Sequence, residues 1–334
     1  MFQHKVTVIG GTGNVGRNVL QMLIDSKLFD ISNIRVTGSI RSAGSYLTLR
    51  GYSFLVHNTD GINFQKDELC IFNTEADVSS KYIPIALESG AYVIDSSSHY
   101  RMHDAVPLIV PNVNIDRVDI KKSKLFTHAN CIVAPIATVI APLHQKFGVS
   151  RVIVSTYQST SGAGKKAMDE CLESTRNFFS SNCSEDSISF PRPITFNVIP
   201  QIGGFDDNGF CSEEMKISNE IKKVISQDIC ISATSVRVPV LIGHSSSLSM
   251  KLESSCHMDD ILHALDKSFG IKISVNNYHT PIEVVGADDV FIGKLRMDGA
   301  VDDQWVHMWV CSDNLRIGAA TDSFQITKAI AMQI

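Results

Sequence analysis

The chain has 334 residues, which at about 100–200 residues per domain predicts two domains. Apolar residues make up 44% of the chain and charged residues 19%, proportions that are typical of folded proteins and exclude global disorder. With 30 Lys and Arg against 35 Asp and Glu, the formal net charge of −5 argues against a protein that mainly coats nucleic acid or an anionic membrane.

The first 128 residues follow the order of a parallel α/β sheet. A β-branched run, Lys5–Ile9, leads into the glycine turn Gly10–Gly16, and apolar residues at helical spacing follow from Val19 to Leu28. Further strands are predicted at Ile34–Thr37, Leu69–Asn73 and Tyr92–Ile94, with a helix at Ser79–Ser89. We therefore predict a Rossmann-like, doubly wound nucleotide-binding domain.

From Val149 the pattern changes to that of an α+β domain. Runs rich in Val, Met and aromatic residues alternate partly with polar residues, which predicts a mixed, largely antiparallel sheet. The predicted strands are Arg151–Tyr157, Ser235–Ile242, Ser247–Leu252 and Gln304–Cys311, and the predicted helices are Lys165–Phe179, Met215–Ile225 and Ala319–Met332. The pattern alone assigns the last helix to neither domain.

The glycine turn Gly10–Gly16 stands between a strand and a helix, as a dinucleotide-binding turn requires. Its glycines allow the backbone to approach a pyrophosphate closely at the N-terminus of the helix. The next strand is followed by Ser39, Arg41 and Ser42, with no acidic residue. Arginine and hydroxyl groups suit a 2′-phosphate and favour NADP over NAD, whereas an exposed arginine on a surface loop is the alternative.

The eight cysteines are too few for a disulfide scaffold, and no two lie within four residues of each other, so no metal site is predicted. The start of the chain shows no secretory signal. The longest apolar run, Cys131–Leu143, has 13 residues and two prolines, too short for a membrane-spanning helix. We expect a cytoplasmic protein with reduced cysteines and with neither a membrane nor a nucleic acid as partner.

Cys131 differs from the other cysteines because it precedes a predicted helix, Ile132–Phe147, for which Asn130 is the expected N-cap. The positive end of a helix stabilises a thiolate, and its N–H groups can receive an oxyanion. The segment therefore offers a candidate nucleophile, with a buried cysteine that begins a core helix as the alternative.

A nucleophilic thiolate needs a base, and His244 is the most distinctive of the eleven histidines. It follows a glycine at the end of a predicted apolar strand, and Arg237 lies near the other end of that strand. An arginine beside a histidine suits an anionic substrate. A core or turn histidine with satisfied hydrogen bonds is the alternative for His244.

Together these motifs closely resemble those of the aspartate-β-semialdehyde dehydrogenase family, in the same order along nearly the whole chain. The segments that carry the resemblance are GGTGNVG (10–16), RSAG (41–44), VIDSSSHYRM (93–102), ANC (129–131), STYQSTSGAGKKAMDE (155–170), FNVIPQIGGF (196–205), SEEMK (212–216), RVPVLIGHSSS (237–247) and DNLRIGAA (313–320). Several of them are specific to that family.

The resemblance implies NADP-dependent reduction of aspartyl-4-phosphate to aspartate 4-semialdehyde, in the biosynthesis of lysine, through diaminopimelate, and of threonine and methionine. It implies an NADP-binding domain over residues 1–128, joined by a returning C-terminal helix at 319–334. Residues 129–318 would form the catalytic and dimerisation domain. The partner it implies is a second copy of the chain, in a homodimer.

The resemblance also implies roles for individual residues. Cys131 would be the nucleophile, His244 the acid/base and Gln158 the residue that orients the acyl intermediate. Arg237 would hold the substrate α-carboxylate, and Glu213 the α-amino group. A cysteine suits this chemistry because a thioester, unlike a carboxylate, is activated toward hydride.

Phosphate and cofactor residues follow in the same way from the resemblance. The phosphate site it implies comprises Arg101, Asn130 and Lys216. The cofactor residues it implies are Gly10, Thr12, Gly13, Asn14 and Val15 at the pyrophosphate, Arg41 and Ser42 at the 2′-phosphate, and Ser161 and Gly162 near the nicotinamide.

Four positions depart from the family pattern. Glu75 and Asp77 stand near the expected cofactor path, where small residues are usual, and Asp322 stands where Asn is common near the nicotinamide. Ala129 replaces a proline that usually precedes Asn-Cys. None of these departures removes a catalytic group, but the three acidic residues bear on cofactor affinity.

Two other readings of the sequence stay open. N-acetyl-γ-glutamyl-phosphate reductases have a similar design, but they carry Pro-Gly-Cys-Tyr where this chain has Ala-Asn-Cys-Ile at 129–132. A catalytically silent relative that serves as a binding protein is the second alternative. Such a protein could lose its nucleophile freely, whereas Cys131, Gln158, Arg237 and His244 are all present.

Overall fold

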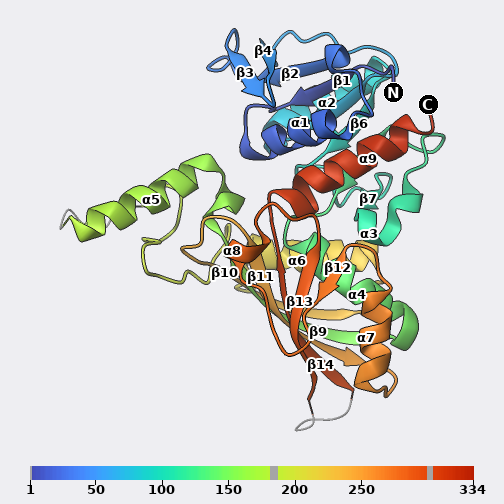
Figure 1. Cartoon of the computed structure of the whole chain (residues 1–334), viewed down its shortest axis with the longest axis vertical. Helices are drawn as coiled ribbons and strands as arrows, with labels where there is room; N and C mark the ends of the chain where they lie inside the picture. The colour runs from blue at the N-terminus through green and yellow to red at the C-terminus, as the bar shows by residue number, and fades with distance from the viewer. Residues whose placement is uncertain (1, 181–186, 299–303) are drawn as a thin grey trace. The chain divides into compact units, whose positions relative to one another are not determined.

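The computed structural model describes residues 2–180, 187–298 and 304–334 (Figure 1). The chain forms two compact units, unit 1 with residues 1–130 and 318–334 and unit 2 with residues 131–317. Unit 1 has a mostly parallel sheet and unit 2 a mixed sheet, which confirms the predicted α/β fold class. None of the helices in the described residues combines the length and hydropathy that a membrane-spanning segment needs.

In the described part of unit 1, eight strands form one sheet. The strands are β1 (Val6–Ile9), β2 (Ile34–Gly38), β3 (Tyr46–Leu49), β4 (Tyr52–Asn58), β5 (Leu69–Phe72), β6 (Tyr92–Asp95), β7 (Leu108–Ile109) and β8 (Leu125–His128). The helices are α1 (Asn14–Ser26), α2 (Ala76–Glu88), α3 (Pro111–Asn114) and α9 (Thr321–Ala331), with 3-10 turns η1 (Ile31–Asn33) and η2 (Ile115–Arg117). The strand order is β3-β4-β2-β1-β5-β6-β8-β7, and the β3–β4 pair is antiparallel.

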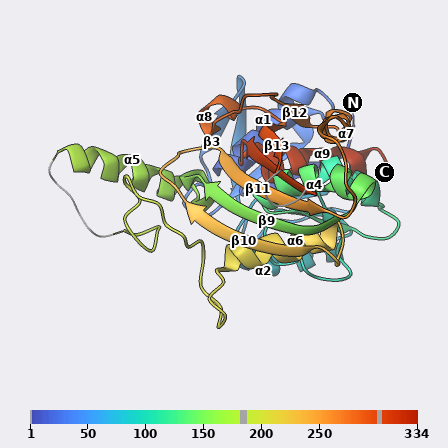
Figure 2. The same cartoon turned by 90° about the horizontal axis from the view of Figure 1, so that it is seen from below.

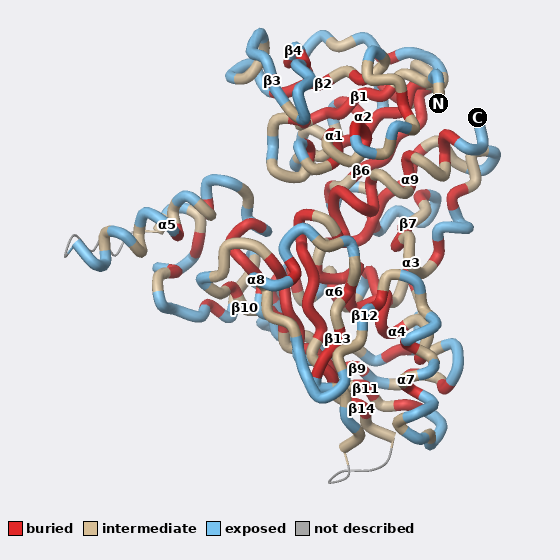
Figure 3. Tube along the Cα trace, viewed as in Figure 1, coloured by how far each residue is buried: buried red, intermediate tan, exposed pale blue. Residues whose placement is uncertain are grey.

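Helices cover both faces of this sheet, which is why its central strands are apolar on both sides. Leu69 and Ile71 of β5 belong to a core that includes residues of α1 and α9, whereas Phe72 of the same strand packs in a second core with residues of α2. Figure 3 shows the buried segments of these strands in red. The apolar strand runs of the sequence therefore correspond to the buried centre of unit 1.

The chain reverses its direction across the sheet between β1 and β5. From β1 it continues to β2 on one side, and from β5 to β6 on the other. An ideal Cβ on Gly10, which has φ +74°, would lie 2.3 Å from the carbonyl oxygen of Asn73, so only glycine fits this turn after β1. The glycine turn thus lies at the topological switch point, where doubly wound folds bind ligands.

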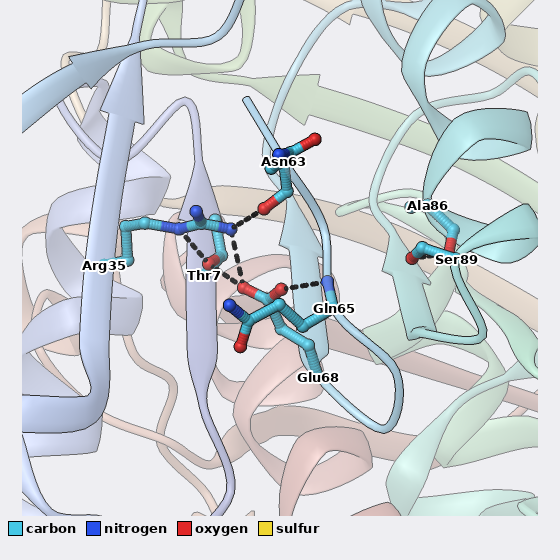
Figure 4. Close-up of polar contacts among 7 residues, drawn as sticks. All are labelled: Thr7, Arg35, Asn63, Gln65, Glu68, Ala86 and Ser89. Atoms are coloured by element: carbon cyan, nitrogen blue, oxygen red, sulfur yellow. Dashed lines mark hydrogen bonds and ion pairs between the residues drawn. The ribbon is translucent and has the colours of Figure 1, made fainter. Parts of the chain in front are cut away.

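A buried ion pair joins three strands of unit 1 near their amino ends (Figure 4). Nη2 of Arg35 lies 2.8 Å from Oε1 of Glu68, whose side chain is fully buried. Thr7 donates to the same carboxylate and accepts from Nε of Arg35 at 2.9 Å. The backbone N–H of Gln65 donates to the other carboxylate oxygen at 2.8 Å, so both oxygens of this buried carboxylate have partners.

Unit 2 is built on a mixed sheet of six strands among its described residues. The strands are β9 (Val149–Gln158), β10 (Cys230–Arg237), β11 (His244–Leu252), β12 (Ile271–Ile273), β13 (Val290–Met297) and β14 (Trp305–Ser312). The helices are α4 (Val133–Phe147), α5 (Lys165–Phe179), α6 (Ser212–Val224), α7 (Met258–Asp266) and α8 (Pro281–Val284), with the 3-10 turn η3 (Thr160–Ala163). The order is β10-β9-β11-β14-β13-β12.

The strands of unit 2 run in mixed directions. The pairs β9–β10 and β12–β13 are parallel, and the pairs that β11 and β14 make are antiparallel. Helix α5 extends away from the sheet in both views (Figures 1 and 2), and its residues are largely exposed. A π-helical turn, η4 (Arg316–Ala320), leads from this unit into α9.

Two predicted boundaries beside Arg237 and Cys131 are wrong. The strand predicted at Ser235–Ile242 ends at Arg237, because Pro239 cannot donate to a sheet ladder. Asn130 does not cap the helix after Cys131: α4 begins at Val133, its N-cap is Ile132, and no side chain caps it. Apolar packing sets this helix start, since Ile132, Val133 and Pro135 are all buried.

Candidate active site

Three of the predicted residues lie at one end of the six-stranded sheet. Gln158 is the last residue of β9 and Arg237 the last of β10, and the two are paired in parallel register. His244 is the first residue of β11, which runs antiparallel to β9, so it reaches the same end. The prediction that Arg237 and His244 share one strand is wrong, because residues 238–243 form a connection that ends at Gly243 with φ +97°.

Cys131 lies against His244. Its Sγ is 3.4 Å from Nε2 of His244, although the two residues are 113 positions apart in the sequence. Cys131 is partly buried, two residues before the start of α4, and the His244 side chain is almost completely buried. The thiol is therefore within hydrogen-bond reach of a ring nitrogen, as nucleophilic catalysis by a cysteine requires.

Burial keeps the His244 ring neutral. It lowers the pKa of His244 to about 3, because the imidazolium form would be desolvated, and the positive charge of Arg237 adds to the effect. A hydrogen bond with the backbone at Gly243 opposes the shift only in part. At neutral pH the site therefore holds a neutral imidazole beside the sulfur.

Two residues that the sequence analysis did not single out support the other ring nitrogen: Ser159 contacts it, and Asn314 contacts Ser159. The backbone N–H of Ser159 donates to Nδ1 of His244 at 3.1 Å, and Oγ of Ser159 also lies 3.1 Å from Nδ1. Oγ of Ser159 donates in turn to Oδ1 of Asn314 at 3.1 Å. Both residues belong to motifs that carry the family resemblance, 155–170 and 313–320, which was the available signal.

Arg237 and Glu213 add buried charges to this end of the sheet. The Arg237 side chain is almost fully buried, and its Nη1 donates to the carbonyl oxygen of Ser159 at 2.6 Å. Burial lowers the pKa of Arg237, while the nearby Glu213 and Cys131 oppose that shift. Glu213 is buried in the first turn of α6 and accepts from Nζ of Lys216 at 3.1 Å. The site thus holds a cation and an anion close enough to influence each other, the pair of charges that an α-amino acid would match.

Ser161 and Gly162 lie in the η3 turn directly beside these residues. An ideal Cβ on Gly162 would lie 3.0 Å from Nη1 of Arg237 and 3.1 Å from Nε2 of His244. Oγ of Ser161 accepts from Nδ2 of Asn314 at 2.9 Å. The backbone at Gly162 therefore forms one wall of the space around His244.

The glycine turn of unit 1 has features that fit the phosphates of a dinucleotide. Gly13 is the N-cap of α1 without a side-chain cap, and the first turn carries no acidic residue. An ideal Cβ on Gly16 would lie 2.4 Å from the carbonyl oxygen of Gly10, so glycine is needed for the close turn. The positive end of α1 is thus left open to an anion, as the predicted role of Gly10, Gly13 and their neighbours requires.

Thr12 and Ser42 both lie close to the end of β2. An ideal Cβ on Gly38 would lie 2.3 Å from Oγ of Ser42 and 3.4 Å from Oγ1 of Thr12. Arg41, next to Ser42, is exposed. Two hydroxyl groups and a guanidinium thus lie around the carboxyl end of β2, a set of donors that fits a phosphorylated ribose.

The three acidic departures from the family pattern differ in burial. Glu75 and Asp77 are exposed at the start of α2, and Asp77 accepts from the backbone N–H of Val78 at 2.8 Å. Asp322 is buried in the first turn of α9. Two of the three carboxylates therefore remain in contact with solvent, where their charge is screened.

The expected phosphate residues are divided between the units: Arg101 and Asn130 belong to unit 1, and Lys216 belongs to unit 2. Arg101 and Asn130 are both buried. Beside Arg101 stands His128, whose Nδ1 donates to the carbonyl oxygen of Ala129 at 3.0 Å. Burial first, and the Arg101 charge second, lower the pKa of His128 to about 4.

None of the described cysteines forms a disulfide, and Cys183 lies outside the described residues. Within the described ranges, no group of three or more His, Cys, Asp or Glu side chains could hold a metal ion. Cys131 differs from Cys70, Cys171, Cys211 and Cys311, which are buried. Partial exposure next to a buried histidine and arginine is the setting of a reactive cysteine rather than of a core thiol.

Comparison with known proteins identifies the family of the chain. A family profile described as "Semialdehyde dehydrogenase, NAD binding domain" matches residues 5–122, and one described as "Semialdehyde dehydrogenase, dimerisation domain" matches residues 140–317. The aspartate-semialdehyde dehydrogenase of Rickettsia bellii is 35% identical over 333 residues, 98% of each chain. That of Aquifex aeolicus is 34% identical over 337 residues, 99% of this chain and 98% of the other.

A solved structure gives the same result for the fold. The crystal structure of aspartate semialdehyde dehydrogenase II from Vibrio cholerae, complexed with ASA, matches with a TM-score of 0.94. Its sequence identity is 30%, and the match covers 99% of both chains.

The fold and the site define an oxidoreductase of amino-acid biosynthesis with a Rossmann-like NAD(P)-binding domain and a dimerisation domain. The matches extend over nearly the full length of the chain and of its relatives. The chain belongs to the aspartate-semialdehyde dehydrogenase family. The resemblance seen in the sequence is thus confirmed.

Proposed function

We propose that this chain catalyses the NADP-dependent reductive dephosphorylation of L-aspartyl-4-phosphate to L-aspartate 4-semialdehyde, through a thioester on Cys131. The reaction is reversible and would supply the biosynthesis of lysine, through diaminopimelate, and of threonine and methionine. The observation that carries this proposal is the Cys131–His244 contact, 3.4 Å between Sγ and Nε2, within reach of buried charges at Arg237 and Glu213.

The substrate is an amino acid whose side chain carries an acyl phosphate. Arg237 would bind its α-carboxylate, because a buried guanidinium favours a carboxylate partner. Glu213 would bind its α-amino group. The similar Vibrio cholerae enzyme was crystallised in complex with ASA, which supports a small molecule as the substrate.

Thioester formation would use side chains of this chain. The Cys131 thiolate attacks the acyl carbon, a C–S bond forms, and phosphate leaves with the electron pair of the C–O bond that breaks. Arg101, Asn130 and Lys216 would stabilise the departing phosphate through charge and hydrogen bonds. Gln158, buried at the end of β9, would hold the acyl group in place.

NADPH supplies the hydride that reduces the thioester when it is bound. Gly10, Thr12, Gly13, Asn14 and Val15 would hold its pyrophosphate, Arg41 and Ser42 its 2′-phosphate, and Ser161 and Gly162 the nicotinamide end. His244 would donate a proton to the reacting oxygen as the hydride adds, and take it back as that oxygen becomes the aldehyde carbonyl and the sulfur leaves as the Cys131 thiolate. In this scheme His244 is neutral before and after each turnover, in agreement with its burial.

The organisation of the chain follows from these roles. We assign cofactor binding to residues 1–128 with 319–334, and catalysis and dimerisation to residues 129–318. The dimerisation-domain profile over residues 140–317 supports a homodimer. A reducing compartment, the cytoplasm, suits an enzyme whose Cys131 thiol has to stay reduced.

Trapping the thioester tests the proposed mechanism. With aspartate semialdehyde and NADP but no phosphate, the wild type should form NADPH in a burst of about one equivalent per site, and the protein mass should rise by one aspartyl group. Cys131→Ala should show neither signal, whereas Cys230→Ala, at an exposed cysteine, should behave as the wild type. An adduct on any other residue would refute the role of Cys131.

A further inference from the structure

The hydrogen bonds around His244 determine which ring nitrogen carries the proton. A backbone N–H can only donate, and that of Ser159 points at Nδ1 of His244 from 3.1 Å. Nδ1 therefore accepts and carries no proton of its own. In a neutral imidazole the proton must then be on Nε2, the nitrogen that lies 3.4 Å from Sγ of Cys131.

Hydrogen-bond donors also determine the orientation of the side-chain amide of Asn314, which contacts Ser159. The backbone N–H of Gly243 donates to Oδ1 of Asn314 at 2.8 Å, so this atom is the amide oxygen and not the nitrogen. Oδ1 also accepts from Oγ of Ser159 at 3.1 Å, and Nδ2 donates to Oγ of Ser161 at 2.9 Å. All four of these residues are buried, so the hydrogen bonds have no competition from water.

Ser159 is held from a second side by a residue of the substrate site. Nη1 of Arg237 donates to the carbonyl oxygen of Ser159 at 2.6 Å. One peptide unit on each side of Ser159 is therefore fixed, the N–H toward His244 and the C=O toward Arg237. The groups that face the ring are thus the N–H and Oγ of Ser159 on Nδ1, the backbone at Gly243, the guanidinium of Arg237 and the sulfur of Cys131.

We infer that Ser159 and Asn314 are positioning residues that hold His244 as a single neutral tautomer, with its proton on Nε2 directed at the sulfur of Cys131. This inference rests on the proposed function, since it describes how His244 acts at that site. In the resting enzyme His244 is then a hydrogen-bond donor to the sulfur, and the thiol proton of Cys131 is released to solvent before the thiolate attacks. The same Nε2–H is ready to be donated to the substrate oxygen.

Nitrogen NMR of the ¹⁵N-histidine-labelled protein reads this state directly. We expect the His244 resonances at about pH 7 to show a protonated Nε2 and an unprotonated Nδ1, with no imidazolium. The spectrum of His244→Asn assigns these signals by their loss. A protonated Nδ1, or an imidazolium at about pH 7, would overturn the inference.

Two variants test the positioning role by kinetics. Asn314→Ala should lower kcat about 10- to 100-fold, because the ring is less well placed, while KM for aspartate semialdehyde changes less than about threefold. Ser159→Ala keeps the backbone donor and should therefore keep the tautomer, with a smaller loss of kcat. Ser247→Ala, at an exposed position of β11, is the matched control and should leave kcat unchanged.

The outcomes separate this inference from the proposed function. If the wild type lacks phosphate-dependent activity with aspartate semialdehyde, the proposed function fails, whatever the tautomer. If the wild type is active but Asn314→Ala and Ser159→Ala retain full kcat, the positioning role fails alone. Should Asn314→Ala not fold, Ser159→Ala and the wild-type spectrum still decide the matter.

Discussion

Gly162 lies so close to His244 that the absence of a side chain there is part of the site. Its hypothetical Cβ would be 3.0 Å from Nη1 of Arg237 and 3.1 Å from Nε2 of His244. These separations are shorter than ordinary contacts between side chains. Both neighbouring residues are buried, so neither can move aside without disturbing the site.

Gly162→Ala should therefore reduce kcat/KM for aspartate semialdehyde about 10- to 100-fold, through displacement of His244 and Arg237. Gly204→Ala is the matched control, since a Cβ there would meet no atom within 4 Å. Steady-state kinetics of both variants, with urea unfolding to verify the fold, check the prediction. Unchanged kinetics in Gly162→Ala would mean that a side chain at position 162 displaces neither His244 nor Arg237.

At this scale, the residue types in the motifs were sufficient to select the central pair. Cys131 was selected because it precedes a predicted helix, and His244 because it follows a glycine and an apolar run. The structure places Sγ of Cys131 3.4 Å from Nε2 of His244. Ser159 and Asn314 escaped selection, because serine and asparagine are common and their hydrogen bonds join segments 155 positions apart. Local pattern contains no information on such contacts.

The ion pair of Arg35 and Glu68 shows how the strands of unit 1 are joined. Arg35 belongs to β2, its partner Thr7 to β1, and Glu68 directly precedes β5. The Glu68 side chain is fully buried, so its charge depends on these partners (Figure 4). Removal of one partner from a buried pair leaves a charge without compensation.

Arg35→Met should thus lower the free energy of unfolding by roughly 3 kcal/mol, measured by urea denaturation. The matched control is Arg50→Met, which removes an exposed ion pair with Asp25 and should cost less than about 1 kcal/mol. The double variant Arg35→Met/Glu68→Met should recover much of the loss, because no buried charge remains. Equal effects in Arg35→Met and Arg50→Met would contradict this account.

Strands and helices could be predicted only where the spacing of apolar residues in the sequence matches the burial of those residues in the fold. Fully buried strands such as β1, β5 and β6 have continuous apolar runs and were found. The β3–β4 hairpin was missed, because its exposed faces make the alternation weak. The sequence after Arg237 has the apolar residues of a strand, but it contains Pro239, and the strand ends before it. The start of α4 depends on tertiary packing, which a rule based on capping residues does not include.

Acid stability is a property of the whole molecule to which the buried histidines contribute. His128 has a pKa of about 4 in the folded chain, against about 6.5 for an unperturbed histidine. Between these two values the unfolded chain binds a proton that the folded chain does not. Stability due to this group is therefore complete above about pH 6.5 and is lost as the pH falls toward 4.

The free energy of unfolding should consequently fall by roughly 2 kcal/mol more in the wild type than in His128→Asn between about pH 7 and about pH 5. His263→Asn, which changes an exposed histidine of α7, is the control and should keep the wild-type pH dependence. Urea denaturation at the two pH values measures the difference. A His128→Asn variant with the full pH dependence would show that folding does not lower the pKa of His128.

The central claim concerns the reaction of the whole chain, and one assay tests it most directly. Purified protein with aspartate semialdehyde, phosphate and either NADP or NAD is followed by formation of the reduced cofactor, with Cys131→Ala in parallel. We predict phosphate-dependent turnover that is faster with NADP than with NAD and is absent in Cys131→Ala. Turnover that persists in Cys131→Ala, or no phosphate-dependent turnover in the wild type, would contradict the account.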